Sequence, residues 1–202
     1  SDSIKDYFLS RSKKTSQFIA EINCQSMYYK KQISEVMFNL LDSHDTERIL
    51  TTAKGDIHLV KSALAFLFLQ RGTPCIYYGT ELELDGGMDP DCRRVMPWNR
   101  VSSSNDMLNF MKNLIQLRKD VAGIIQYGKF TLEEIKPNVL ALEWQHDNQA
   151  IRAIFNQSNE NYLLDRDSAD LVSHCQTDDQ QLVILPKGFV VYCDWYKDLS
   201  CI

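Results

Sequence analysis

The spacing of apolar residues divides the chain into two parts with different periodicities. Before residue 120 the apolar positions form either short continuous runs or helical faces, separated by polar segments. The predicted elements are a helical region 4–31, a strand 36–41, a helix 57–70, a strand 74–78 and a helix 106–119. From residue 36 onward the order is strand, helix, strand, helix, which predicts a parallel sheet with crossover helices.

After Gly123 the pattern changes to short alternating runs bounded by turn residues such as Pro, Gly, Asn and Asp. Such runs are typical of an antiparallel β-sandwich. The predicted strands are 128–135, 138–145, 149–156, 160–164, 181–185 and 188–195. We therefore predict an α/β domain over 1–122 and an all-β domain over 123–202.

The two predicted parallel strands cannot form a stable sheet alone, because both edges and both faces would be uncovered. We therefore expect this chain to be the C-terminal part of a larger protein that supplies the remaining strands. As a consequence, the isolated chain is expected to self-associate through the apolar surface of residues 36–78.

Composition narrows the classes of partner. Hydrophobic residues make up 44% and charged residues 24% of the 202 residues, the balance of a globular protein. The net charge of −5 argues against nucleic acid as a partner. The longest apolar run, 63–69, is too short to cross a membrane. The six cysteines show no CxxC pair and no zinc-type spacing, so we expect reduced thiols and a cytoplasmic protein.

A polar cluster, 42–46, directly follows the first predicted strand. In α/β barrels the catalytic groups lie at the C-terminal ends of the strands. A neutral imidazole beside a carboxylate, as in His44 and Asp45, suits directional hydrogen bonds to sugar hydroxyls. The alternative is a loop that caps the next helix and leaves His44 merely exposed.

The long loop 80–104 contains an acidic stretch, 85–91, that superficially suggests calcium. The stretch lacks the EF-hand glycine, contains Pro90 and is followed by two arginines, so we predict neither a metal nor another cofactor there.

Three motifs occur in order. FNLLDSHDT at 38–46 resembles the fourth short conserved region of the α-amylase family of glycoside hydrolases. GTPCIYYG at 72–79, followed by Glu81, resembles the last barrel strand of that family. DPDCRR at 89–94, with MPW at 96–98, is similar to a loop of neopullulanases and cyclomaltodextrinases. Residues 1–35 match no motif of the family.

The resemblance implies a (β/α)₈ TIM barrel, of which this chain carries the last two β/α units, followed by the β-sandwich. The family cleaves α-glucosidic bonds with retention, using a carboxylate nucleophile and a carboxylic acid/base. By motif position Asp45 matches the transition-state stabiliser, and His44 matches a histidine that binds sugar hydroxyls before the scissile bond. Arg93, paired with Asp89, is expected to shape the cleft, and Trp98 is expected to stack on a sugar ring.

The nucleophile and acid/base of the family belong to earlier strands, and nothing in this chain matches those motifs. We therefore expect part of an α-glucan hydrolase that is inactive alone. The expected substrates of the whole enzyme are starch-derived oligosaccharides: cyclomaltodextrin, pullulan and maltooligosaccharides. Asp42 and Glu47 depart from the usual residues of relatives and are expected to add negative charge near the cleft. The alternative function is a non-catalytic carbohydrate-binding or assembly module built on the β-sandwich.

Overall fold

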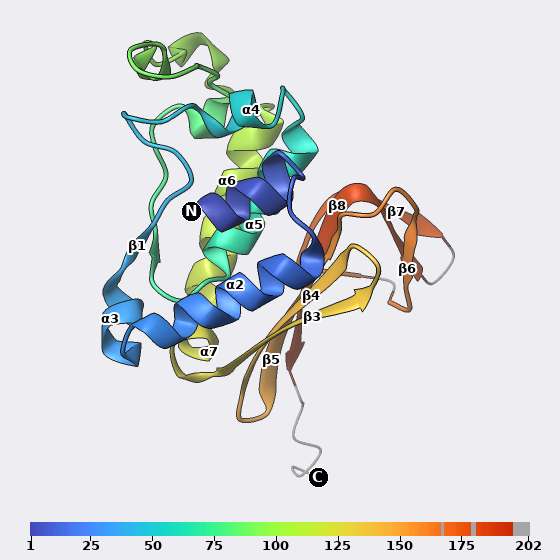
Figure 1. The fold of residues 1–202 in the computed structure, drawn as a ribbon. Coiled ribbons are helices and arrows are strands. Elements are labelled where there is room, and N and C mark those ends of the chain that lie inside the picture. The colour runs from blue at the N-terminus through green and yellow to red at the C-terminus, as the bar shows by residue number, and fades with distance from the viewer. Residues whose placement is uncertain (167, 179–180, 196–202) are drawn as a thin grey trace. The chain divides into compact units, whose positions relative to one another are not determined.

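The computed structural model describes residues 1–166, 168–178 and 181–195 (Figure 1). The chain divides into two compact units, Ser1–Arg118 and Lys119–Ile202. The five cysteines within the described residues are free thiols, and Cys201 lies outside them. Every helix of the described residues is too short or too polar to cross a membrane.

The first unit is mainly helical. The predicted helical region 4–31 is broken, because residues 10–14 are not helical and separate a short π-helical segment from the next helix. The helices are α1 (Asp2–Ile4), the π-helical segment Lys5–Leu9, α2 (Thr15–Tyr28), α3 (Lys31–Val36), α4 (Ile49–Thr52), α5 (Ile57–Phe68) and α6 (Asp106–Asp120). Short 3₁₀ turns occur at Thr80–Leu82, Asp91–Arg93 and Trp98–Arg100.

Helix α5 forms the core of this unit. It begins as predicted at Asp56, whose side chain accepts hydrogen bonds from the backbone N–H groups of His58 and Leu59, at 3.1 and 3.4 Å. Every residue from 59 to 68 is buried, which is expected for a helix whose residues, apart from Lys61 and Ser62, are apolar on all sides. α5 is therefore enclosed by the other elements of the unit.

The N-terminal residues supply part of that enclosure through an aromatic cluster. The rings of Tyr7 and Phe18 are stacked with their centroids 4.3 Å apart, and Phe8 and Phe18 lie 5.2 and 5.1 Å from Phe66 of α5. In Figure 1 the first helices lie alongside α5. Residues 3–22, which lie in the segment without a recognised motif, thus have a packing role.

Two short strands pair in parallel, as the sequence predicted. β1 (Phe38–Asn39) pairs with β2 (Thr73–Pro74), with Phe38 opposite Thr73. Both strands are shorter than predicted, and β2 begins one residue before the predicted strand 74–78. Gly72 enters β2 with a φ of 95°, and a Cβ there would lie 2.7 Å from the carbonyl oxygen of Met37. A glycine is therefore required where the two segments first approach.

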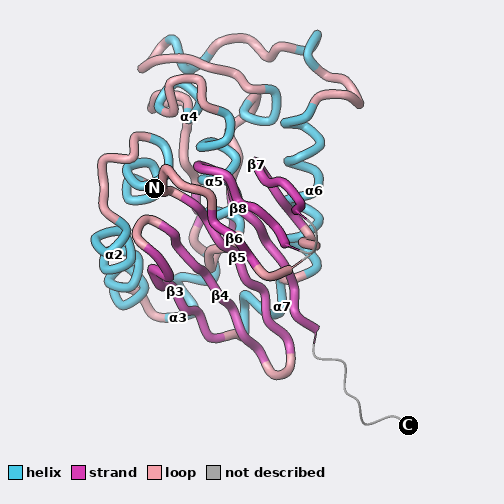
Figure 2. The backbone as a smooth tube through the Cα atoms, turned by 90° about the vertical axis from the view of Figure 1, so that its right-hand side faces the viewer, coloured by secondary structure: helices cyan, strands magenta, loops and turns pink. Residues whose placement is uncertain are grey.

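The second unit contains a six-stranded antiparallel sheet and one short helix, α7 (Ala122–Tyr127) (Figure 2). The path is β3-β4-β5-β8-β6, and β7 also pairs with β8. The strands are β3 (Lys129–Lys136), β4 (Val139–His146), β5 (Gln149–Asn156), β6 (Tyr162–Leu164), β7 (Leu171–Asp178) and β8 (Gln181–Trp195). All six strands belong to one hydrogen-bonded sheet, so a sandwich of two separate sheets is not confirmed.

β8 corrects two sequence predictions. The runs 181–185 and 188–195 form one strand that bends between them, where Lys187 has a φ of 68°. The neighbouring strand β7, which the sequence did not predict, has a matching irregularity at His174, with a φ of 55°. A Cβ at Gly188 would lie 2.4 Å from the carbonyl oxygen of His174, so only glycine allows this approach.

The bend allows the sheet to curl around a single core. Leu182 and Ile184, before the bend, and Val190 and Tyr192, after it, belong to the same buried cluster. Val139 and Ile154, from β4 and β5, complete the cluster. The two halves of β8, together with β4 and β5, therefore enclose a common apolar core on one face of the sheet.

Candidate functional site

The loop between β1 and α4 carries His44 and Asp45. Two local hydrogen bonds define its shape: the N–H of Ser43 donates to Thr46 Oγ1 at 2.9 Å, and the N–H of Asp45 donates to Ser43 Oγ at 3.2 Å. The side chains of His44 and Asp45 are 64% and 66% exposed, and His44 Nε2 lies 3.1 Å from Asp45 Oδ1. The loop thus presents a paired imidazole and carboxylate to solvent.

Arg93 joins this pair to a second loop. Its Nη2 atom lies 3.0 Å from Asp89 Oδ2 and 3.7 Å from Asp45 Oδ1. Its Nε donates to the carbonyl oxygen of His44 at 3.1 Å. The structure therefore brings four of the five predicted site residues together. The ion pairs are exposed and contribute at most about 1 kcal/mol each. The hydrogen bonds between side chains and the main chain therefore contribute much of the local order.

Trp98 lies apart from these four residues. It begins the 3₁₀ turn Trp98–Arg100, and 73% of its surface is exposed. Among the described residues, no side-chain hydrogen bond, ion pair or ring contact joins Trp98 to His44, Asp45, Asp89 or Arg93. Trp98 presents a free aromatic face on the loop that follows Arg93.

The acidic stretch is organised by arginine. Arg94 binds Asp91 through two hydrogen bonds of 2.8 Å and Asp85 through a third of 2.7 Å. The N–H of Gly87 also donates to Asp91 at 2.7 Å. These bonds, that with Arg94 foremost, lower the pKa of Asp91 below its usual range. Asp85 and Asp91 are thus used to fold the loop around Arg94.

Sequence reasoning missed Arg48. Its side chain is fully buried, although the sequence suggests only a charged loop residue. Its Nε donates to the carbonyl oxygen of Cys92 at 2.7 Å, and its Nη1 donates to that of Tyr78 at 2.6 Å. The guanidinium carbon lies 4.0 Å from the ring centroid of Tyr77 and 4.7 Å from that of Tyr78. The one feature of the sequence that could have indicated its burial is its position directly before the apolar Ile49.

Asp42 corrects another expectation, because its carboxylate is buried and does not face the cleft. Its Oδ2 accepts hydrogen bonds from the N–H of Ile49 at 3.2 Å and from Thr80 Oγ1 at 3.4 Å. Burial raises the pKa of Asp42 above its usual range, although these hydrogen bonds and Arg48 oppose the shift. Asp42 therefore acts as a structural link between the start of α4 and the segment after β2.

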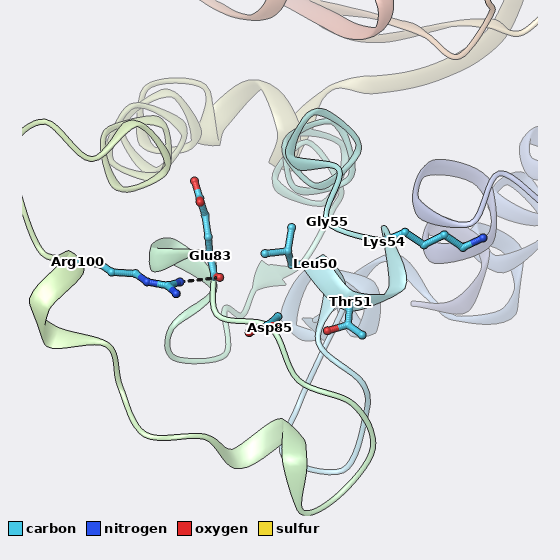
Figure 3. Close-up of a pocket in the computed structure, with 7 residues that line it drawn as sticks. All are labelled: Leu50, Thr51, Lys54, Gly55, Glu83, Asp85 and Arg100. Carbon is cyan, nitrogen blue, oxygen red and sulfur yellow. Dashed lines mark hydrogen bonds between the residues drawn. The ribbon is translucent and has the colours of Figure 1, made fainter.

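A separate depression of about 430 Å³ lies elsewhere on the first unit (Figure 3). Figure 3 shows the Lys54 side chain extending away from it, while Arg100 binds the carbonyl oxygen of Glu83 at 3.1 Å. The polar groups at its rim are thus partly engaged with the protein. Its lining comprises Leu50, Thr51, Lys54, Gly55, Glu83, Asp85 and Arg100.

Comparison with known proteins supports the sequence motifs. The family model described as the catalytic domain of alpha amylase matches residues 4–123. The intracellular maltogenic amylase of Bacillus subtilis is 42% identical over 156 residues, covering 76% of this chain and 26% of that protein. A cyclomaltodextrinase of a Bacillus species is 38% identical over 165 residues, covering 81% of this chain and 29% of that protein. The chain thus spans under a third of the length of these relatives.

Solved structures agree. The cyclic α-maltosyl-(1→6)-maltose hydrolase of Arthrobacter globiformis matches 96% of this chain with a TM-score of 0.80 and 27% identity, over 42% of its own chain. A cyclomaltodextrinase matches 94% with a TM-score of 0.77 and 32% identity, over 35% of its own chain. Because the family model covers more than half of the chain and includes the loops of His44 and Arg93, the chain belongs to the α-amylase family of glycoside hydrolases.

Proposed function

We propose that this chain forms one side of the active site of an α-glucan hydrolase of the cyclomaltodextrinase or maltogenic amylase type. The observation that carries the proposal is the exposed group formed by His44, Asp45, Asp89 and Arg93. Two loops that are far apart in the sequence supply these side chains. The nucleophile and the acid/base of the retaining reaction lie, in this proposal, outside these 202 residues.

Each residue of the group has a role that its chemistry allows. The Asp45 carboxylate stabilises the positive charge that develops on the sugar in an oxocarbenium-like transition state. His44 and the pair Arg93–Asp89 form hydrogen bonds with sugar hydroxyls, since together they offer both donors and acceptors. The exposed ring of Trp98 stacks on the apolar face of a glucose unit.

The substrates proposed are cyclomaltodextrin, pullulan and maltooligosaccharides, with a cytoplasmic location. This choice is supported by relatives named cyclomaltodextrinase, neopullulanase 2 and intracellular maltogenic amylase. Self-association of the isolated chain is supported by Val36 and Phe38 around β1, whose surfaces are 72% and 74% exposed.

The test uses a chimeric enzyme, the Bacillus subtilis maltogenic amylase in which this chain replaces the segment that it matches. We expect the chimera to release reducing sugar from cyclomaltodextrin and the 202-residue chain alone to release none. Asp45→Asn should lower the kcat of the chimera by about 100-fold or more, because the charge that stabilises the transition state is removed.

The matched control is Asp147→Asn. Asp147 is also an exposed aspartate beside a histidine, His146, at 3.7 Å, but it lies in the turn between β4 and β5. Its φ of 50° is tolerated by asparagine, so the substitution should leave kcat unchanged. Equal activity of the Asp45 and Asp147 variants would contradict the role of Asp45. Turnover by the isolated chain would contradict a nucleophile outside it.

A further inference from the structure

Arg48 lies where three segments of the candidate site meet. It belongs to the loop that carries His44 and Asp45, and its backbone N–H donates to the carbonyl oxygen of Gly86 at 3.0 Å. Its guanidinium donates to the carbonyl oxygen of Tyr78, beyond β2, and to that of Cys92. One side chain therefore connects the loop after β1, the segment after β2 and the loop that carries Arg93.

The connection to Cys92 reaches the functional pair. The Cys92 thiol donates to the carbonyl oxygen of His44 at 3.0 Å, and Arg93 Nε donates to the same oxygen at 3.1 Å. Arg48 thus holds the peptide of Cys92, and the side chains of Cys92 and Arg93 hold the backbone of His44. A displacement of the Arg48 side chain would therefore move the peptide of Cys92, the backbone of His44 and, with it, the neighbouring Asp45.

The burial of this charge is costly in itself. Arg48 is fully buried, and among the described residues no carboxylate oxygen lies within 4 Å of its guanidinium. Its Nη2 atom is buried without a hydrogen-bond partner there. Arg48 acts on the buried carboxylate of Asp42 only from beyond contact distance, where it favours a lower pKa of that group. Burying a cation without a carboxylate in direct contact is unfavourable, and an apolar side chain of similar volume would fill the space at lower cost. Packing alone therefore does not explain why an arginine occupies this buried position.

We propose that Arg48 is a positioning residue for the reaction. Its planar guanidinium, which donates to two carbonyl oxygens and lies over two tyrosine rings, fixes the loop of His44 and Asp45 relative to Arg93. A lysine cannot replace it, because an ammonium group lacks the rigid fork that spans two carbonyl groups. This inference rests on the proposed function, in which the position of the Asp45 carboxylate determines the stabilisation of the transition state.

The chain offers a matched control in Arg118. This arginine is half-buried and binds three carbonyl oxygens, those of Phe68, Gln70 and Gly72, at 2.7 to 2.8 Å. These carbonyls lie between the end of α5 and the start of β2, away from the His44 loop in the sequence. Arg118→Lys should therefore remove a comparable set of guanidinium–carbonyl hydrogen bonds and destabilise the fold without moving the site.

The experiment compares Arg48→Lys with Arg118→Lys in the chimeric enzyme. We expect both to lower the melting temperature. Only Arg48→Lys should lower kcat, by about 10- to 100-fold, with KM for cyclomaltodextrin changed less than about threefold, because a displacement of about 1 Å at a catalytic group costs up to about 100-fold. If Arg48→Lys does not fold, Arg48→Gln, which keeps one donor group, is measured in its place.

Three results would overturn the proposal: an unchanged kcat in the Arg48 variant, a change confined to KM, or an equal loss of kcat in the Arg118 variant. If the unsubstituted chimera is inactive, the proposed function fails and the positioning role is decided in the 202-residue chain. There the NMR resonances of the His44 imidazole should move in the Arg48 variant and not in the Arg118 variant. Unmoved His44 resonances would contradict the positioning role independently of activity.

Discussion

Replacement of Phe18 by alanine should destabilise the first unit, because this ring joins the N-terminal helices to α5. Phe18 is completely buried, and its ring stacks on Tyr7 with a centroid distance of 4.3 Å and an interplanar angle of 5°. It also contacts Phe8 and Phe66, with centroids 5.7 and 5.1 Å away. The substitution removes the centre of a four-ring cluster.

The expected loss in the free energy of unfolding follows from the complete burial of Phe18. Truncation of a buried phenylalanine to alanine costs about 3–5 kcal/mol, the sum of lost transfer free energy and the cavity left behind. A domain of this size has a free energy of unfolding of about 5–15 kcal/mol, so the loss is a large fraction of the total. With a urea m-value of about 2 kcal/mol per M, the unfolding midpoint should fall by about 2 M.

The assay is urea unfolding of the 202-residue chain, followed by circular dichroism at 222 nm, which reports mainly the helices of the first unit. Tyr28→Ala is the control, since Tyr28 lies on the same helix α2 but is 73% exposed, and it should cost less than about 0.5 kcal/mol. If Phe18→Ala prevents folding, Phe18→Leu should cost about 1.5 kcal/mol or less. Equal midpoints for Phe18→Ala and Tyr28→Ala would refute the packing role of the N-terminal aromatic cluster.

Two further predictions concern ionisation. Burial raises the pKa of Asp42 above 3.8, so the folded chain binds this proton more tightly than the unfolded chain, and the resulting stability is lost as pH rises through the folded pKa. Asp42→Asn should therefore gain stability relative to wild type between pH 3.5 and pH 7 in urea unfolding, and a constant difference would contradict this. Burial raises the pKa of Cys175 to about 11 and that of Cys193 to about 12, whereas Cys24 and Cys75 are exposed. Iodoacetamide at pH 8 should modify the exposed pair more than about tenfold faster, measured by peptide mass spectrometry, and equal rates would argue against burial of the other two.

Local signals in the sequence predicted several elements well. Asp56 caps α5 as expected, because an aspartate before an apolar run satisfies free N–H groups through its own side chain. The parallel pairing of β1 and β2 followed from the alternation of apolar runs with a helix. The error at Pro186–Gly188 has a physical cause. Turn residues usually indicate the end of a strand, but here they bend β8, and β7 pairs with β8 both before and after the bend.

The grouping of four site residues also followed from motifs, since His44 and Asp45 were predicted together and Arg93 was paired with Asp89. The charged residues behind them were not predictable in this way. Asp42 and Arg48 are polar residues in a loop, and composition places such residues in water. Their burial depends on partners 30 to 44 residues away, the carbonyl groups of Tyr78 and Cys92 among them.

The sequence alone determined what many short segments can do: where α5 begins, which runs form most of the strands, and which loop carries the imidazole and the carboxylate. These properties depend on interactions between residues that are close in the sequence, so the local pattern of apolar and polar residues predicts them. The tertiary structure alone decided that β8 is one bent strand, that the helices within residues 3–22 pack on α5, and that Arg48 is buried beneath the site. Those outcomes depend on contacts between distant segments, whose free energy arises only when the chain is folded.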